Sequence, residues 1–184
     1  MGIRELRAET PRLRIGPLED RDCGVFCALF TDEETMHFVG PPLPKEKALE
    51  DFEAALRVSR RDPPRQLYMR IARSGDPEDG AIGICSVQQI DLQRRRAEIG
   101  LMLQAPHRAH GLGRESIRAL VRAAFDAFPI DEIWAQYDAR HIAAERLFIG
   151  AGFSSCAYEG ADTDGARWRF RSVFRQSWEG QDEE

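Results

Sequence analysis

Residues 97–127 read AEIGLMLQAPHRAHGLGRESIRALVRAAFDA, and this stretch decides the fold. A short apolar strand, Glu98 to Leu103, leads into a loop, Gln104 to Leu112, and the sequence then becomes helical. The helix is predicted because its apolar residues recur at spacings of three, four, seven and eight, which places them on one face. These residues are Ile117, Leu120, Val121, Ala124 and Phe125.

The loop before this helix is predicted to bind an anion. It contains Arg108, Gly111 and Gly113. Glycines let the backbone turn tightly and bring bare N–H groups close to a ligand. Unpaired N–H groups at a helix N-terminus, together with the positive end of the helix dipole, favour negative charge. The strand, loop and helix therefore indicate a phosphate-bearing ligand held by the backbone.

Two well-known phosphate-binding patterns do not fit this loop. The nucleoside-triphosphate loop requires Gly-Lys-Ser/Thr, whereas Gly113 is followed by Arg114. The dinucleotide fingerprint requires a third glycine, where this chain has Ser116, and an acidic residue that ends the next strand. Asp131 and Glu132 precede that strand instead of ending it.

A third pattern fits the loop. Residues 108–113, Arg-Ala-His-Gly-Leu-Gly, match the Arg/Gln-x-x-Gly-x-Gly/Ala signature of the GCN5-related N-acetyltransferase (GNAT) family. Glu98-Ile99-Gly100 on the preceding strand and Leu147…Gly152-Phe153 further along agree with it. Residues 9–22, ETPRLRIGPLEDRD, resemble the first strand and helix of the branch that includes the ribosomal-protein N-terminal acetyltransferases (RimJ/RimL type). The resemblance covers residues 9–176.

The resemblance implies acetyl-coenzyme A as the acyl donor. In this family the coenzyme lies between the strand before the signature and the strand after the helix, which splay apart. Backbone groups of Leu101, Met102 and Leu103 would then hydrogen-bond its pantetheine arm. A plain glycine-rich connection between strand and helix is the alternative. The backbone N–H groups expected to hold the pyrophosphate are those of Arg108, Ala109, His110, Gly111, Leu112, Gly113 and Arg114.

Three positions depart from the family pattern. The family usually pairs Asn with Ser near the coenzyme, and this chain has His141 and Ala144. His141 can still donate to a carbonyl or phosphate; alternatively, it faces solvent at a helix start. Many relatives have Tyr where this chain has Phe148, and Phe cannot protonate the leaving thiolate. Either Tyr137 or Tyr158 substitutes for it, or no acid is needed, because a coenzyme thiolate is a tolerable leaving group near neutral pH.

Glu98 is the candidate catalytic residue, because it matches a carboxylate that opens this strand in many relatives. The attacking amine must be uncharged, so a base is useful. The alternative is a surface glutamate in a cross-strand pair with one of residues 94–96. His107 and His110 flank the site, and His110 is expected to contact phosphate. His37 is a second base candidate, in the segment that lines the acceptor pocket in this family.

The rest of the chain predicts one α/β domain, residues 1–184, with a core from about residue 9 to 176 and an acidic, frayed tail at 177–184. The sheet is expected to be mixed, with about seven strands that form an antiparallel meander and a splayed parallel pair, flanked by helices. Strands are predicted at 12–17, 66–72, 81–90, 94–103, 132–137, 152–158 and 167–175.

Further helices are predicted at 19–30, 31–39, 45–60 and 141–149. Thr31 with Glu34 predicts a capping box at the second of them. Helical spacing in the third places an apolar face inward. That face consists of Ala48, Leu49, Phe52, Ala55 and Leu56.

The composition is that of a soluble globular protein, with 42% hydrophobic and 31% charged residues. A net charge of −5 disfavours nonspecific nucleic-acid binding. No apolar run reaches the length of a membrane span, and the N-terminus lacks an apolar signal core, so we expect a cytoplasmic protein. Cys23 and Cys27 share a helix face, but no nearby His or second Cys pair completes a metal site. We therefore expect reduced, buried thiols and no metal.

The function expected from this resemblance is acetyl-coenzyme A-dependent N-acetylation, in which a primary amine attacks the thioester directly within a ternary complex. The acceptor remains open between a protein N-terminus, a polyamine, an amino acid and an aminoglycoside-like antibiotic. The alternative is a noncatalytic coenzyme-binding or regulatory module, which the residues at 141, 144 and 148 favour. A homodimer is common among relatives.

Overall fold

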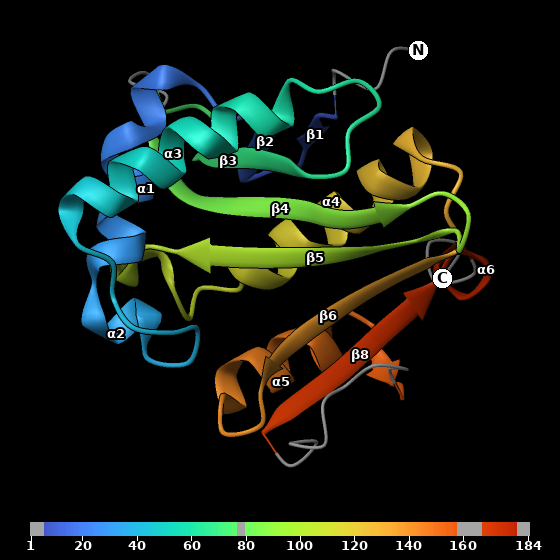
Figure 1. Cartoon of the computed structure of the whole chain (residues 1–184). Helices are drawn as coiled ribbons and strands as arrows, with labels where there is room; N and C mark the ends of the chain where they lie inside the picture. The colour runs from blue at the N-terminus through green and yellow to red at the C-terminus, as the bar shows by residue number, and fades with distance from the viewer. Residues whose placement is uncertain (1–5, 77–79, 158–166, 180–184) are drawn as a thin grey trace.

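The computed structural model describes residues 6–76, 80–157 and 167–179. Its centre is one sheet of eight strands in the order β1-β2-β3-β4-β5-β6-β8-β7 (Figure 1). Neighbouring strands are antiparallel, except that β5 and β6 are parallel. The strands are β1 (Ala8–Glu9), β2 (Leu13–Pro17), β3 (Leu67–Arg73), β4 (Ala81–Asp91), β5 (Arg96–Leu103), β6 (Glu132–Asp138), β7 (Ser154–Ser155) and β8 (Trp168–Phe174).

Helices cover both faces of the sheet. One face packs against α4 and α5, and the other against α1 and α3. The short α2 lies near the end at which β5 stops, and α6 follows β8 directly. The helices are α1 (Cys23–Thr31), α2 (Glu33–Met36), α3 (Lys45–Ser59), α4 (Leu112–Ala127), α5 (Ile142–Gly150) and α6 (Arg175–Glu179), with 3-10 turns at Asp20–Asp22 and Ala105–His107.

Alternation along β5 separates two hydrophobic cores. Ala97, Ile99 and Leu103 belong to the core beneath α4, whereas Met102 packs against the core beneath α1 and α3. Successive side chains of a strand point to opposite faces, so Glu98 and Gly100 lie on the Met102 face. The face of β5 that carries Glu98 is therefore the one opposite α4.

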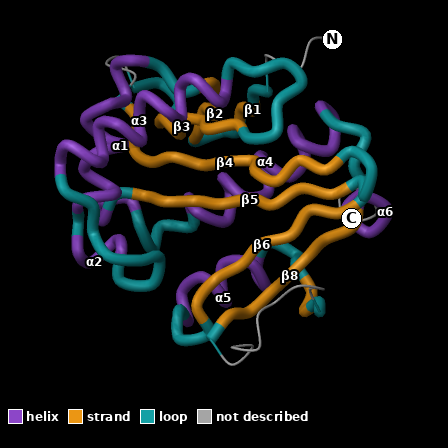
Figure 2. Tube along the Cα trace, in the orientation of Figure 1, coloured by secondary structure: helices purple, strands orange, loops and turns teal. Residues whose placement is uncertain are grey.

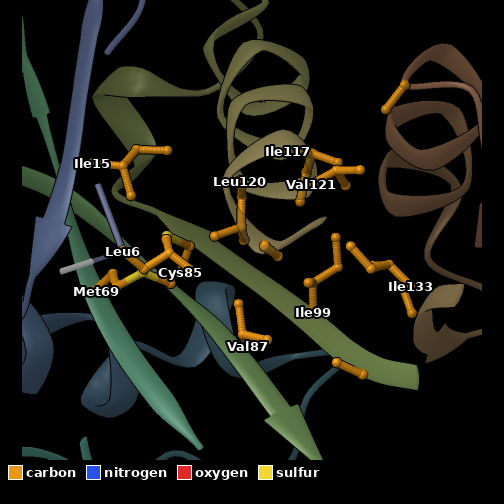
Figure 3. Close-up of a cluster of buried hydrophobic side chains, with 14 of the residues drawn as sticks. Leu6, Ile15, Met69, Cys85, Val87, Ile99, Ile117, Leu120, Val121 and Ile133 are labelled. Atoms are coloured by element: carbon orange, nitrogen blue, oxygen red, sulfur yellow. The ribbon is translucent and has the colours of Figure 1, made fainter. Parts of the chain in front are cut away.

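The inner face of α4 is as predicted. The five apolar residues at helical spacing are each at most 4% exposed. Figure 3 shows Ile117, Leu120 and Val121 of α4 gathered above Ile99 of β5. Burying a side chain of this size contributes about 1.5–3 kcal/mol. This packing holds the N-terminus of α4 in place beside the end of β5.

The parallel pair β5 and β6 separates along its length. Their register joins Arg96 to Glu132, Ala97 to Ile133 and Glu98 to Trp134, and no further pair follows among the described residues. Figure 2 shows the two strands diverging beyond this point. We call this separation, from Ile99 to Leu103 on β5, the strand split. The splayed parallel pair expected from the sequence is confirmed.

The mixed α/β fold is confirmed, but several local predictions are wrong. An eighth strand, β1, precedes the predicted first one. The side chain of Asp32, not Thr31, accepts from the N–H of Thr35 and caps α2. Leu49 is 40% exposed and does not join the inner face of α3.

Differences also occur near the C-terminus. The strand predicted at 152–158 is reduced to β7, and residue 158 lies outside the described residues. The start of the predicted frayed tail is wrong, because α6 includes residues 177–179 and Trp178 is only 3% exposed. Residues 180–184 lie outside the described part.

Candidate functional site

The loop before α4 turns through two residues in the left-handed region. Ala109 has φ 63° and Gly111, the N-cap of α4, has φ 77°. Gly113 was expected in this loop, but it lies in the first turn of the helix. A Cβ there would lie 3.3 Å from Cδ1 of Leu147 and 3.5 Å from Cδ2 of Leu101. Gly113 therefore allows close packing of α4 against α5 and β5 and does not make the turn.

The same loop presents a run of unpaired backbone donors. The N–H of Arg108 donates to the carbonyl of Ala105, and the N–H of Glu115 donates to Gly111. Between them, none of the N–H groups of residues 109–114 donates a hydrogen bond to the described part of the chain, and Gly111 supplies no side-chain cap. Six consecutive unpaired donors at a helix N-terminus suit an anion, and the ligand expected for this loop stays a prediction.

A residue far away in sequence fixes this loop from outside. Nη1 of Arg12, just before β2, donates to the carbonyl of His110 at 3.1 Å. Arg12 is also ion-paired with Glu115 in the first turn of α4, and the hydroxyl of Thr10 donates to the same carboxylate. The loop carbonyl is thus turned toward Arg12. No pattern in the sequence predicts this contact.

The side chain of Arg108 has a structural role at the other end of the loop. Its Nε donates to the carbonyl of Leu103 at 2.9 Å. Its Nη1 lies 3.3 Å from Glu34, and its Nη2 donates to the hydroxyl of Thr35. Arg108 therefore joins the end of β5 to α2. The backbone of Leu103 was predicted to contact the ligand, but its carbonyl already accepts this hydrogen bond from Arg108.

Glu98 lies where the strand split begins, beside Trp134 of β6. Its Oε2 accepts from Nε2 of Gln89 at 2.7 Å. Burial raises the pKa of the Glu98 carboxyl, and this effect is larger than the opposite effect of the Gln89 bond. A raised pKa makes the carboxylate a better proton acceptor. The partner shown for Glu98 is thus an amide and not one of the expected arginines.

His141 caps α5 at the open end of the strand split. Its Nδ1 accepts from the N–H of Ala144 at 3.4 Å. Its ring stacks on Phe38, which follows α2, with a centroid separation of 4.5 Å. His37 packs edge-on against the same phenylalanine. Burial lowers the pKa of His141, so the ring is neutral at pH 7 and carries its proton on Nε2.

Phe148 and Tyr137 form part of the packed core. Their rings stack at 5.6 Å, and they are each 6% exposed. The phenolic oxygen of Tyr137 accepts from Nε of Arg171 at 2.7 Å, and Arg171 also holds Glu145 at 3.0 Å. The burial of the Tyr137 ring in the core argues against its use as a substitute acid. Tyr158, the other substitute, lies outside the described residues.

Polar residues that the sequence reading missed lie beside Glu98. Gln88 of β4 is opposite Glu98, and Ser86 is opposite Gly100. The signal was present in β4, where Ser86 and Gln88 alternate with the buried Cys85 and Val87. Such alternation places polar side chains on one face of a strand.

The described residues contain no group of three or more His, Cys, Asp or Glu arranged to hold a metal ion. Cys23 and Cys27 are free and half-buried, with their sulfur atoms 4.0 Å apart. Within the same part of the chain, no helix is both long and apolar enough to cross a bilayer.

Comparisons with known proteins agree with this geometry. A solved structure of spermidine N-acetyltransferase from Vibrio cholerae, in complex with CoA and spermine, is 14% identical with a TM-score of 0.75, covering 92% of this chain and 99% of that chain. Aminoglycoside acetyltransferase AAC(6')-Ib in complex with coenzyme A is 14% identical with a TM-score of 0.74 and the same coverage. Microcin C7 self immunity acetyltransferase MccE, in complex with acetyl-CoA and AMP, is 13% identical with a TM-score of 0.73, covering 90% of this chain and 93% of that chain.

These similarities establish the fold, and the match of this chain to a family model establishes the family. The model that describes the acetyltransferase (GNAT) domain matches residues 12–154, well over half of the 184 residues. The match includes the strand split, the loop with the unpaired N–H groups of residues 109–114, which we call the donor loop, and the start of α4. The chain therefore belongs to the GNAT acetyltransferase family.

Proposed function

We propose that this protein is an acetyl-coenzyme A-dependent N-acetyltransferase that acts on a primary amine. The observation that carries the proposal is the row of six unpaired N–H groups at residues 109–114, placed at the end of the strand split. A pyrophosphate fits such a row, because the donors and the helix dipole both favour negative charge. The solved relatives with CoA or acetyl-CoA support the same ligand.

The residues around the split supply binding and proton transfer. Acetyl-coenzyme A would provide the acetyl group as a thioester, with its pyrophosphate on the loop and its pantetheine arm along Leu101 and Met102. His141 would add one donor through its Nε2–H. Glu98 would accept the proton of the ammonium form, directly or through water, so that the amine nitrogen can attack the carbonyl carbon.

The chemistry then needs one bond to form and one to break. The amine nitrogen bonds to the acetyl carbon, and the bond from that carbon to sulfur breaks. Because Phe148 is packed in the core and has no proton to give, solvent protonates the leaving thiolate. A free thiol has a pKa of about 8.5, so the thiolate can leave near neutral pH without an acid beside it.

The finer assignment to the RimJ/RimL-type branch rests on residues 9–22. Part of this segment forms β2, and Arg12 within it holds the donor loop through His110. We propose that the opening segment belongs to the ligand site through this contact.

Thiol release tests the proposed activity. Purified protein is mixed with acetyl-coenzyme A and a panel of primary amines, and free thiol is measured with time. We expect amine-dependent release that saturates with the amine, and an N-acetyl product of the correct mass. Tight binding of acetyl-coenzyme A without release for any amine would favour a noncatalytic coenzyme-binding module.

A further inference from the structure

Two cysteines lie one turn apart on α1 and face each other. Cys23 is the first residue of the helix, and Cys27 follows four residues later. This spacing places two side chains next to each other on one face of a helix. Their sulfur atoms are 4.0 Å apart, and both residues are half-buried. The pair is therefore within reach of solvent and is arranged so that one ligand can touch both sulfur atoms.

The distance between the sulfur atoms fits a bridging metal ion better than a disulfide. A disulfide would require the two atoms to approach each other by about 2 Å within a continuous helix. Metal–sulfur bonds of about 2.3 Å place two sulfur atoms about 4.6 Å apart across a linearly coordinated ion. The observed 4.0 Å differs from this span by only about 0.6 Å, which a small rotation of the side chains supplies.

The number of ligands selects the kind of ion. Among the described residues, no third His, Cys, Asp or Glu joins the pair to complete a larger metal site. Structural zinc sites take four ligands, so the pair does not suit Zn(II). Cu(I) and Ag(I) are soft, monovalent ions that two thiolates in a line can satisfy. The expectation of no metal was drawn from missing further ligands, which a two-coordinate ion does not need.

The surroundings of the pair also suit a soft cation. Cys23 packs against the apolar core beneath α1 and α3. Burial and the contact with Cys23 raise the pKa of the Cys27 thiol, so its sulfur keeps its proton in the free protein at neutral pH. A bound ion displaces the protons of both thiols, which leaves one net negative charge on two thiolates and a monovalent cation. Lys45, whose positive charge acts on Cys27 from the start of α3, offsets that charge.

We propose that Cys23 and Cys27 form a binding site for one Cu(I) or Ag(I) ion, held by their two thiolates across the first turns of α1. Two S–H bonds break, two metal–sulfur bonds form, and both protons go to solvent, with no change of oxidation state. Because sulfur fills both positions of the ion, none is open for a substrate, and the site is not catalytic. The inference does not depend on the acetyltransferase activity proposed above.

Competition with a chromogenic Cu(I) chelator tests the site. Reduced protein is titrated with Cu(I) in the absence of oxygen, and the absorbance of the chelator reports the ion that the protein retains. We expect the wild type to retain one ion per chain. Cys23→Ser and Cys27→Ser should each weaken binding by roughly 10²-fold or more, because a single thiolate remains. Cys156→Ser is the matched control, since Cys156 is also a free, half-buried cysteine, and it should bind as the wild type does.

Thermal melts give a second readout and check that each variant folds. Without the ion, the wild type and the three variants should all unfold cooperatively. A ligand that binds only the folded chain raises its Tm by mass action. One equivalent of Ag(I) should therefore raise the Tm of the wild type and of Cys156→Ser, and should leave the Tm of Cys23→Ser and Cys27→Ser unchanged.

Three results would overturn the inference. The first is Cu(I) binding by the wild type that is no tighter than binding by either variant of the pair. The second is loss of binding in Cys156→Ser, which would place the ion elsewhere. The third is retention of Zn(II) as tightly as Cu(I), which a site of two thiolates does not provide.

Discussion

Glu98 is the residue that we propose as the proton acceptor, and its environment suits that role. It lies half-buried at the start of the strand split, and burial raises the pKa of its carboxyl. A carboxylate with a raised pKa accepts a proton more readily than an ordinary one. Gln89 fixes its orientation through a 2.7 Å hydrogen bond.

Glu98→Gln should lower turnover by roughly 10²-fold and leave acetyl-coenzyme A binding intact. In the wild type, kcat/KM should fall as the pH drops through the raised pKa of Glu98, because the protonated form cannot accept a proton. This acidic limb should lie above the ordinary Glu value of about 4.3 and should be absent from the variant. The measurement is kcat/KM for one amine across a pH series.

Glu53→Gln provides the control for Glu98→Gln, because it removes an exposed carboxylate on α3. It should behave as the wild type at every pH. Turnover of Glu98→Gln within about twofold of the wild type would remove Glu98 from the mechanism.

Single residues were predictable where their role depends on neighbours in sequence. The place of Glu98 on the strand before the signature was predicted correctly, and its catalytic role stays a prediction. The side chain of Arg108 could not, because its partners Thr35 and Glu34 lie on α2, far away in the chain. The same is true of Arg12, which precedes its partner His110 by 98 residues in the chain.

At the scale of elements, the N-terminus of α5 depends on His141. Its Nδ1 accepts from the N–H of Ala144, and its ring stacks on Phe38. His141→Ala should lower the free energy of unfolding by about 1 kcal/mol, the usual cost of losing an N-cap. His141→Asn should keep most of that stability, because Asn is among the best capping residues. Denaturant unfolding of the three proteins measures this difference.

The His141 cap should also make stability depend on pH. Burial lowers the pKa of His141 in the folded protein, so its contribution is complete above the unfolded value of about 6.5. That contribution is lost as the pH falls from there through the lowered folded pKa, because protonation removes the acceptor. His141→Asn should lack this loss between neutral and mildly acidic pH. An identical pH dependence in both proteins would show that His141 does not titrate with folding.

Periodicity predicted some elements well and their ends less well. The inner face of α4 was correct because five apolar residues repeat at helical spacing and are all buried. The cap of α2 was wrong because Thr31 and Asp32 are adjacent and both residue types favour an N-cap. Only the backbone conformation decides between them, and α1 continues through Thr31.

At the scale of the whole molecule, the sheet is opened at one place. Pairing of β5 with β6 ends at Glu98, and α4 starts beside the end of β5 with its donors unpaired. The parallel pair followed from the sequence because a crossover helix joins its strands, and the split was expected from the resemblance to the GNAT family. The short β1 and the packing of Trp178 did not, since two-residue pairing and terminal docking leave no periodic signal.

Calorimetric titration of acetyl-coenzyme A into the wild type, Gly111→Val and Gly75→Val tests the central claim most directly. Both glycines have φ 77°, and a Cβ at either position meets no close backbone, so each variant should lose about 1–3 kcal/mol of stability through strain. Only Gly111 lies in the donor loop. We predict that Gly75→Val binds as the wild type does, whereas Gly111→Val binds more than tenfold more weakly, a loss above about 1.4 kcal/mol. A folded Gly111→Val protein that binds acetyl-coenzyme A as tightly as the wild type would contradict the account, because the loop would then be only a connection between β5 and α4.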